Sequence, residues 1–143
     1  MYAALRTVPI PDEVVARLFH AASLLREHRG DGHIAALMIE GVGGLEAHVL
    51  LALDMDMPAK DFGRIHHLPA AQLAAVIDGM RDRGLIGADG WLSEEGHTVK
   101  QRVEAFTDDL AAKPYETLDP AELDELMAAL EPLATRLLAA QEW

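Results

Sequence analysis

Ionisable side chains occupy six of the eight positions from residue 26 to residue 33, in the sequence REHRGDGH. Arginine can hold a carboxylate or a phosphate, histidine can exchange a proton near neutral pH, and an aspartate can orient either group. The predicted ligand-binding residues are Arg26, His28, Arg29, Asp31 and His33. No catalytic residue and no cofactor is predicted with them.

The same residues also have a purely structural interpretation. Cations in the last turn of a helix complement its dipole, Gly30 suits a helix C-cap, and Asp31 suits the start of a following helix. The sequence leaves both interpretations open. It also leaves open whether such a site would only bind a ligand or would catalyse a reaction.

No metal site is predicted. Histidines and carboxylates gather near residue 30, and His66 and His67 are adjacent, but no HExxH motif or paired ligand spacing is present.

Composition favours a single domain over residues 1–143. Half of the residues are hydrophobic, which predicts apolar surface to bury against a second copy of the chain. There is no cysteine, so we expect no disulfide and a reducing, cytoplasmic location. No apolar run reaches the roughly 20 residues of a membrane span, so no membrane partner is predicted.

Helical periodicity and capping residues predict a mainly α fold. A glycine corner at 30–32 and a glycine bend at 41–44 separate the first three predicted helices. The expected helices are about 12–29, 33–40, 45–53, 58–67, 69–83, 94–113 and 119–140. The helices at 12–29 and 119–140 are the predicted dimerisation helices.

The segment from 69 to 92 predicts a helix followed by a hairpin. Leu73, Val76, Ile77 and Met80 recur at helical spacing, and Gly84 suits the left-handed residue after the helix. Two apolar pairs, 85–86 and 91–92, then flank a turn that ends in Asp-Gly, the pattern of a short β-hairpin. Helix, hairpin and helix in succession predict a winged helix-turn-helix, with the motif and its wing at about 58–92.

Three segments between residues 68 and 138 resemble MarR-type winged-helix regulators: RDRGLI, WLSEEGHTVKQRVE and LDPAELDELMAAL. The run LLREHRGDGHIAAL resembles a narrower actinobacterial family of MarR-like proteins. The resemblance implies a homodimeric transcription regulator that responds to a small-molecule ligand. Members of the narrower family have a preceding helical half, which a second subunit could replace.

Duplex DNA is the partner that this resemblance implies. Gln72 is the side chain on the predicted recognition helix that can read a base edge, and basic residues nearby can contact phosphates. The predicted DNA-binding residues are Lys60, Arg64, His66, His67 and Gln72.

Charge argues against this partner. The net charge is −12, and residues 58–92 hold four Lys or Arg against four Asp or Glu. The predicted wing tip, 87–90, is short and acidic where MarR-type wings are longer and rich in arginine. The alternative is therefore a protein that has lost DNA binding and acts as a small-molecule-binding, resistance or biosynthetic accessory protein or enzyme through the 26–33 segment.

Overall fold

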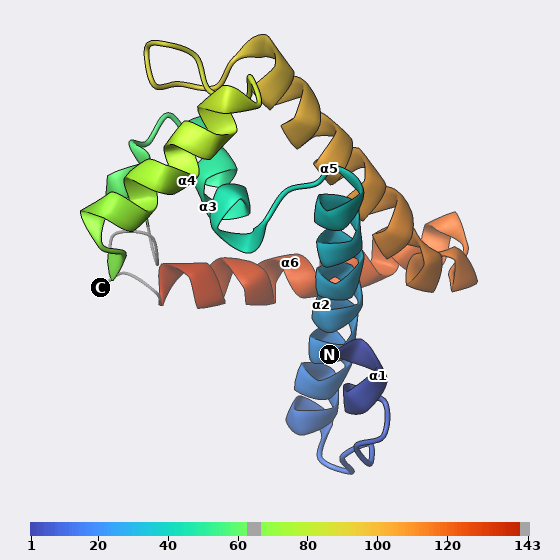
Figure 1. Cartoon of the computed structure of the whole chain (residues 1–143). Coiled ribbons are helices and arrows are strands. Elements are labelled where there is room, and N and C mark those ends of the chain that lie inside the picture. The colour runs from blue at the N-terminus through green and yellow to red at the C-terminus, as the bar shows by residue number, and fades with distance from the viewer. Residues whose placement is uncertain (63–66, 141–143) are drawn as a thin grey trace. The chain divides into compact units, whose positions relative to one another are not determined.

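The computed structural model describes residues 1–62 and 67–140, which are mainly helical as predicted (Figure 1). The chain divides into two compact units, Met1–Ala111 and Ala112–Trp143. The first unit contains α1 (Tyr2–Leu5), α2 (Val14–Ile39), α3 (Gly44–Asp54), the 3-10 helix η1 (Ala59–Asp61), α4 (Ala70–Asp82) and nearly all of α5 (Glu94–Ala112). The second unit contains η3 (Lys113–Thr117) and α6 (Pro120–Ala139).

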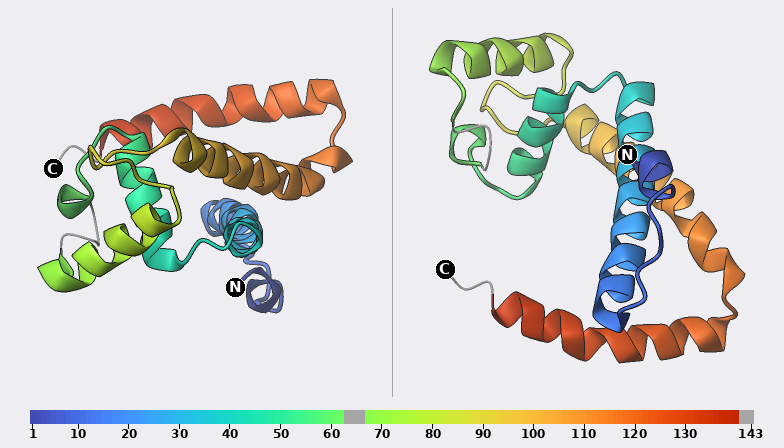
Figure 2. Two further views of the ribbon diagram at one scale, coloured as in Figure 1. Left: turned by 45° about the horizontal axis from the view of Figure 1, so that its top comes forward. Right: turned by 90° about the horizontal axis from the view of Figure 1, so that it is seen from below.

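The predicted corner at Gly30–Gly32 is wrong, because α2 runs through it as one helix. A helix tolerates an isolated glycine when packing offsets the cost of about 1 kcal/mol relative to alanine. Gly32 lies where α2 passes beside α5, and a Cβ there would stand 3.2 Å from the Cβ of Leu110 (Figure 2). The glycine thus allows a close helix–helix approach.

The glycine bend at 41–44 is confirmed. Gly41 has φ +65°, a left-handed conformation that suits a glycine at the end of α2. At the start of α3, the backbone N–H of Gly43 donates to the Glu46 carboxylate at 2.8 Å. This bend brings α3 out of the line of α2.

The predicted β-hairpin wing is also wrong, since residues 1–62 and 67–140 contain no strand. Only an isolated antiparallel bridge joins Ile86 to Leu92, with the Gly87 N–H donating to the Trp91 carbonyl at 2.8 Å. The flanking helices explain the difference. Gly84 ends α4 with φ +75°, and the Ser93 hydroxyl caps α5 by accepting from the Gly96 N–H at 3.0 Å. The turn at 87–90, closed by the Gly90 N–H donating to the Gly87 carbonyl at 3.1 Å, uses half of the residues between these caps and leaves only the Ile86–Leu92 bridge.

The core of the first unit joins α3, α4 and the start of α5. Leu50, Met80 and Val103 are almost completely buried there. Leu73 and Met80 anchor the inner face of α4, as its apolar spacing predicts. Because Leu85 and Ile86 are buried beside them, the segment after α4 is held against the same core.

The second unit consists mainly of α6, which begins as its sequence predicts. The Asp119 carboxylate accepts from the N–H groups of Ala121 and Glu122, and the Glu122 carboxylate accepts from the Asp119 N–H at 2.9 Å.

Within the described residues no single helix is long and apolar enough to cross a membrane, although α2 and α3 pass that test as a pair bent by 97°.

Candidate functional site

The continuous α2 separates the five predicted ligand-binding residues into two groups. Arg26, Arg29 and His33 stand at i, i+3 and i+7, so they share one face of the helix. These three border a shallow hollow of about 270 Å³. His28 and Asp31 point away from that face and have structural partners.

The partners of His28 and Asp31 belong to α5 and α1. His28 donates from Nε2 to the Leu110 carbonyl at 3.1 Å, and its ring lies 4.9 Å from that of Tyr2. The Asp31 carboxylate accepts from the Tyr2 N–H and from the amino group of Met1, each at 3.1 Å. The hydrogen bond from that amino group is the main reason that the pKa of Asp31 is lowered. These contacts hold the short helix α1, which the sequence did not predict, against α2.

The two arginines are exposed and paired with carboxylates. Arg29 Nη2 lies 3.3 Å from a Glu104 oxygen and 3.4 Å from an Asp108 oxygen, so it bridges α2 and α5. Arg26 forms an ion pair with its neighbour Glu27. An anionic ligand would therefore compete with a carboxylate of the protein for either guanidinium group.

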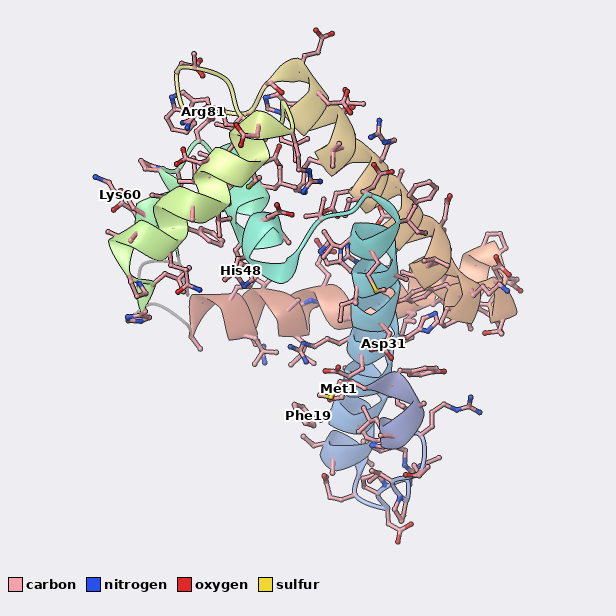
Figure 3. All side chains as sticks on the ribbon, in the orientation of Figure 1. Met1, Phe19, Asp31, His48, Lys60 and Arg81 are labelled. Carbon is pink, nitrogen blue, oxygen red and sulfur yellow. The ribbon has the colours of Figure 1, made fainter. Side chains whose placement is uncertain are left out.

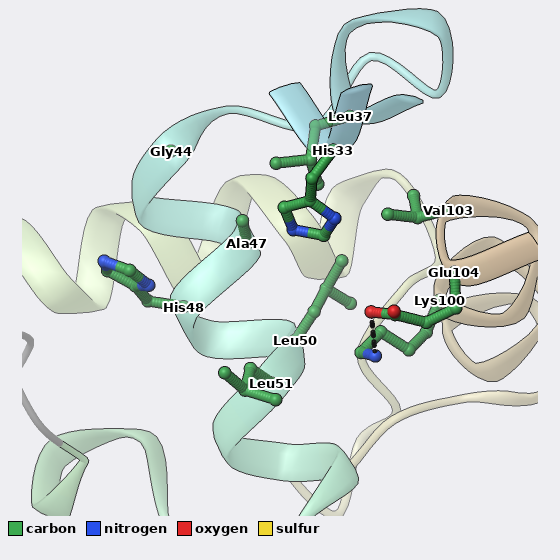
Figure 4. Close-up of a pocket in the computed structure, with 10 residues that line it drawn as sticks. All are labelled: His33, Leu37, Gly44, Ala47, His48, Leu50, Leu51, Lys100, Val103 and Glu104. Atoms are coloured by element: carbon green, nitrogen blue, oxygen red, sulfur yellow. Dashed lines mark hydrogen bonds and ion pairs between the residues drawn. The ribbon is translucent and has the colours of Figure 1, made fainter. Parts of the chain in front are cut away.

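His33 borders a second, better defined pocket of about 300 Å³ between α2, α3 and α5 (Figure 4). Its walls are mainly apolar, with the His33 ring pointing inward and a Lys100–Glu104 pair on the α5 side. The lining residues are His33, Leu37, Gly44, Ala47, His48, Leu50, Leu51, Lys100, Val103 and Glu104.

Thr107 fixes the orientation of the His33 ring. The Thr107 hydroxyl is fully buried and donates to the Val103 carbonyl. The hydroxyl has one proton, so it must accept in its contact with His33 Nδ1, at 3.0 Å. His33 therefore carries a proton on Nδ1, and its Nε2 has no hydrogen bond to the described part of the chain.

Lys100 and Glu104 form the charged side of the pocket. Lys100 Nζ donates to Glu104 at 2.7 Å and lies 3.7 Å from an Asp54 oxygen. The hydrogen bond from Lys100 is the main reason that the pKa of Glu104 is lowered, with smaller contributions from His33 and Arg29. Neither residue of this pair was predicted from the sequence, and Thr107 was not predicted either. The available signals were the i, i+4 spacing of the pair and a threonine four residues after Val103, on an apolar face.

The predicted DNA-binding residues lie around α4. Gln72 is exposed near its N-terminus, among the exposed alanines Ala70, Ala71, Ala74 and Ala75. Lys60 extends outward from η1 (Figure 3), and His67 is exposed just before α4. Arg64 and His66 fall outside the described residues. Further along α4, Asp78 is paired with Arg81 at 2.6 Å.

No group of three His, Cys, Asp or Glu side chains in residues 1–62 and 67–140 could hold a metal ion.

A family model described as a helix-turn-helix family matches residues 1–143. The chain belongs to this helix-turn-helix family. No curated protein and no solved structure matches it. Membership of a helix-turn-helix family indicates a DNA-binding, regulator-type protein. In helix-turn-helix proteins the second helix of the motif lies in the major groove and contacts bases through its N-terminal residues.

Proposed function

We propose that this helix-turn-helix protein is a MarR-like transcription regulator whose DNA binding responds to a small-molecule ligand. In this proposal α4 is the recognition helix and the pocket between α2, α3 and α5 receives the ligand. Two copies of the chain bind one operator.

The observation that carries the DNA-binding part is the distribution of side chains along α4. Its inner face is anchored by Leu73 and Met80, while the exposed N-terminal half holds Gln72 and no acidic residue. Asp78 and Asp82 lie in the C-terminal half. A recognition helix that inserts its N-terminal end would keep these carboxylates farther from the phosphates.

The packing of α3 supports the ligand-responsive part. Ala47, Leu50 and Leu51 of α3 line the pocket, and α3 also packs against α4. A ligand that binds better to one position of α3 would therefore shift the equilibrium position of α4.

Exposed apolar side chains support the homodimer. Val14, Val15 and Phe19 of α2 are each at least 70% exposed, and α6 exposes Leu133, Leu137 and Leu138. These residues lie on the two helices predicted for dimerisation, and burying them against a second copy would remove their apolar surface from water.

Fluorescence anisotropy at low salt tests the DNA-binding part, with duplexes from the chain's own upstream region and a random-sequence pool. We expect a bound fraction at micromolar protein. Gln72→Ala should weaken the affinity for the preferred duplex by about tenfold or more, because a bidentate base contact is lost. Gln101→Ala is the matched control, since Gln101 is exposed on α5 and should leave binding unchanged. Failure to bind any duplex would contradict this part.

A second candidate function follows from the acidic surface. Asp78 and Asp82 on α4 and Asp89 in the following turn are exposed, and the chain carries a net charge of −12. This charge repels a polyanion. In that case the protein is a small-molecule-binding accessory protein or enzyme of the same fold, using the pocket and the 26–33 segment. This second function would be favoured if the protein binds a small molecule but shows no DNA binding in the anisotropy experiment.

A further inference from the structure

We propose that the pocket between α2, α3 and α5 binds a neutral, mainly hydrocarbon molecule with one hydrogen-bond donor, such as a hydroxyl group, and that His33 Nε2 accepts this bond. The inference deepens the proposed function, because it names the class of ligand for the same pocket. Three features of the described residues carry it.

The first feature is the fixed tautomer of His33. The Thr107 hydroxyl donates its only proton to the Val103 carbonyl, so its oxygen accepts from the Nδ1–H of His33. A neutral imidazole with a proton on Nδ1 has a lone pair on Nε2. This nitrogen has no partner among the described residues, and the ring points into the pocket (Figure 4). It is an acceptor that lacks a donor.

The second feature is the neutralisation of the nearby cations. Lys100 is paired with Glu104 at 2.7 Å and lies 3.7 Å from Asp54, with only 13% of its side chain exposed. Arg29 contacts Glu104 and Asp108. An anionic ligand would have to break one of these pairs and leave a carboxylate uncompensated. A neutral ligand has no such cost.

The third feature is the size and lining of the pocket. Side chains of Leu37, Leu50 and Val103 form apolar walls around a volume of about 300 Å³. That volume is at the lower limit of typical ligand sites, so the ligand is small. An apolar body against these walls and a single donor at His33 would satisfy the free acceptor of His33 and leave the Lys100–Glu104 pair intact.

Three matched probes test the inference: cyclohexylmethanol, its methyl ether and cyclohexanecarboxylate. Their dissociation constants are measured with the full chain by NMR titration at about pH 8, at the upper end of the range in which histidines ordinarily change charge. We expect the alcohol to bind about tenfold more tightly than the ether, which lacks the donor, and also more tightly than the carboxylate. Tighter binding of the carboxylate, equal binding of alcohol and ether, or no binding of any probe would overturn the proposal.

Ring substitutions identify the acceptor. His33→Phe keeps the ring but removes both nitrogens, and it should abolish the preference for the alcohol over the ether. His48→Phe is the matched control, because His48 lines the same pocket from α3 (Figure 4). The control should keep the preference, and the reverse pattern would assign the acceptor to His48 and refute the assignment to His33. Circular dichroism of both variants confirms folding.

Thr107→Val provides a second variant with nearly the same volume. It removes the oxygen that holds the Nδ1–H, so either nitrogen of His33 can carry the proton. The preference for the alcohol should decrease while the ether binds as before. An unchanged preference in a folded variant would refute the role of Thr107.

These measurements are separate from the DNA-binding assay. A chain that binds DNA but shows no preference for the alcohol refutes only the proposed ligand class. A chain that prefers the alcohol but binds no duplex refutes only the proposed DNA-binding regulator.

Discussion

Glu104 connects two helices of the first unit through its carboxylate. One oxygen accepts from Lys100 at 2.7 Å, and the other lies 3.3 Å from Arg29 of α2. Lys100 is the larger influence and holds the pKa of Glu104 below its ordinary value near 4.5. A carboxyl group whose pKa is lower in the folded state stabilises the fold fully above its unfolded pKa. That contribution is lost as the pH falls through the folded pKa.

Lys100→Met should therefore destabilise the protein at neutral pH by an amount that shrinks below about pH 4.5. The measurement is the free energy of unfolding in urea at a series of pH values, for wild type and variant. Lys113→Met is the control, since no ion pair of Lys113 occurs among the described residues. A difference between Lys100→Met and wild type that stays constant down to pH 3 would show that the pair does not set the pKa of Glu104.

At the scale of single residues, sequence reasoning worked where the partner lies close in the chain. Gly84, Ser93 and Asp119 adopt the capping roles that their types predict, because each cap depends on the next few residues. The 26–33 cluster behaves differently. His28, Arg29 and His33 have partners on α5 that lie 74 to 82 residues later, and no local pattern specifies those contacts.

At the scale of elements, the two glycines in α2 misled the prediction of its end. Local chemistry favours a break at Gly30–Gly32, but neither glycine has a positive φ. The approach of α2 to α5 at Gly32 makes one helix the more stable solution. Tertiary packing decided this element, whereas the local caps at Gly84 and Ser93 limit the segment between α4 and α5 to a single bridge.

Alanine substitutions test the continuity of α2. A Cβ at Gly30 would meet no atom within 4 Å, so Gly30→Ala should stabilise the protein by about 0.5–1 kcal/mol through helix propensity. Gly32→Ala should be less stable than Gly30→Ala by about 1 kcal/mol, because its Cβ crowds Leu110. Thermal and urea unfolding measure both. A destabilising Gly30→Ala would instead indicate a turn at this position.

Substitution of Gly96 tests the close contact between the start of α5 and the backbone of Leu85, in the segment where a wing was predicted. Gly96 is buried in the first turn of α5, and a Cβ there would overlap the carbonyl oxygen of Leu85. Gly96→Ala should lower the free energy of unfolding by about 1–3 kcal/mol. Gly79→Ala is the matched control within α4, where a Cβ meets nothing within 4 Å. It should be neutral or stabilising, and equal effects of the two substitutions would contradict the contact.

At the scale of the whole molecule, composition predicted exposed apolar surface, and the homodimer inferred from it stays a prediction. Half of the residues are hydrophobic, and many large apolar side chains of α2 and α6 are exposed in the single chain. The core of one copy therefore does not bury all of these apolar side chains. The ligand pocket was not predictable in the same way, because α2, α3 and α5 assemble it from residues far apart in the sequence.

The proposed homodimer can be tested by comparing two equivalent substitutions. Phe19 in α2 is 74% exposed (Figure 3), and Met55 after α3 is 57% exposed and lies outside the terminal helices. Sedimentation equilibrium of the wild-type chain should give a dimer at micromolar concentration. Phe19→Glu should weaken association by about tenfold or more, since it places a charge in an apolar interface, whereas Met55→Glu should not. A monomeric wild-type chain at high micromolar concentration, or equal effects of the two variants, would exclude dimerisation through this face of α2.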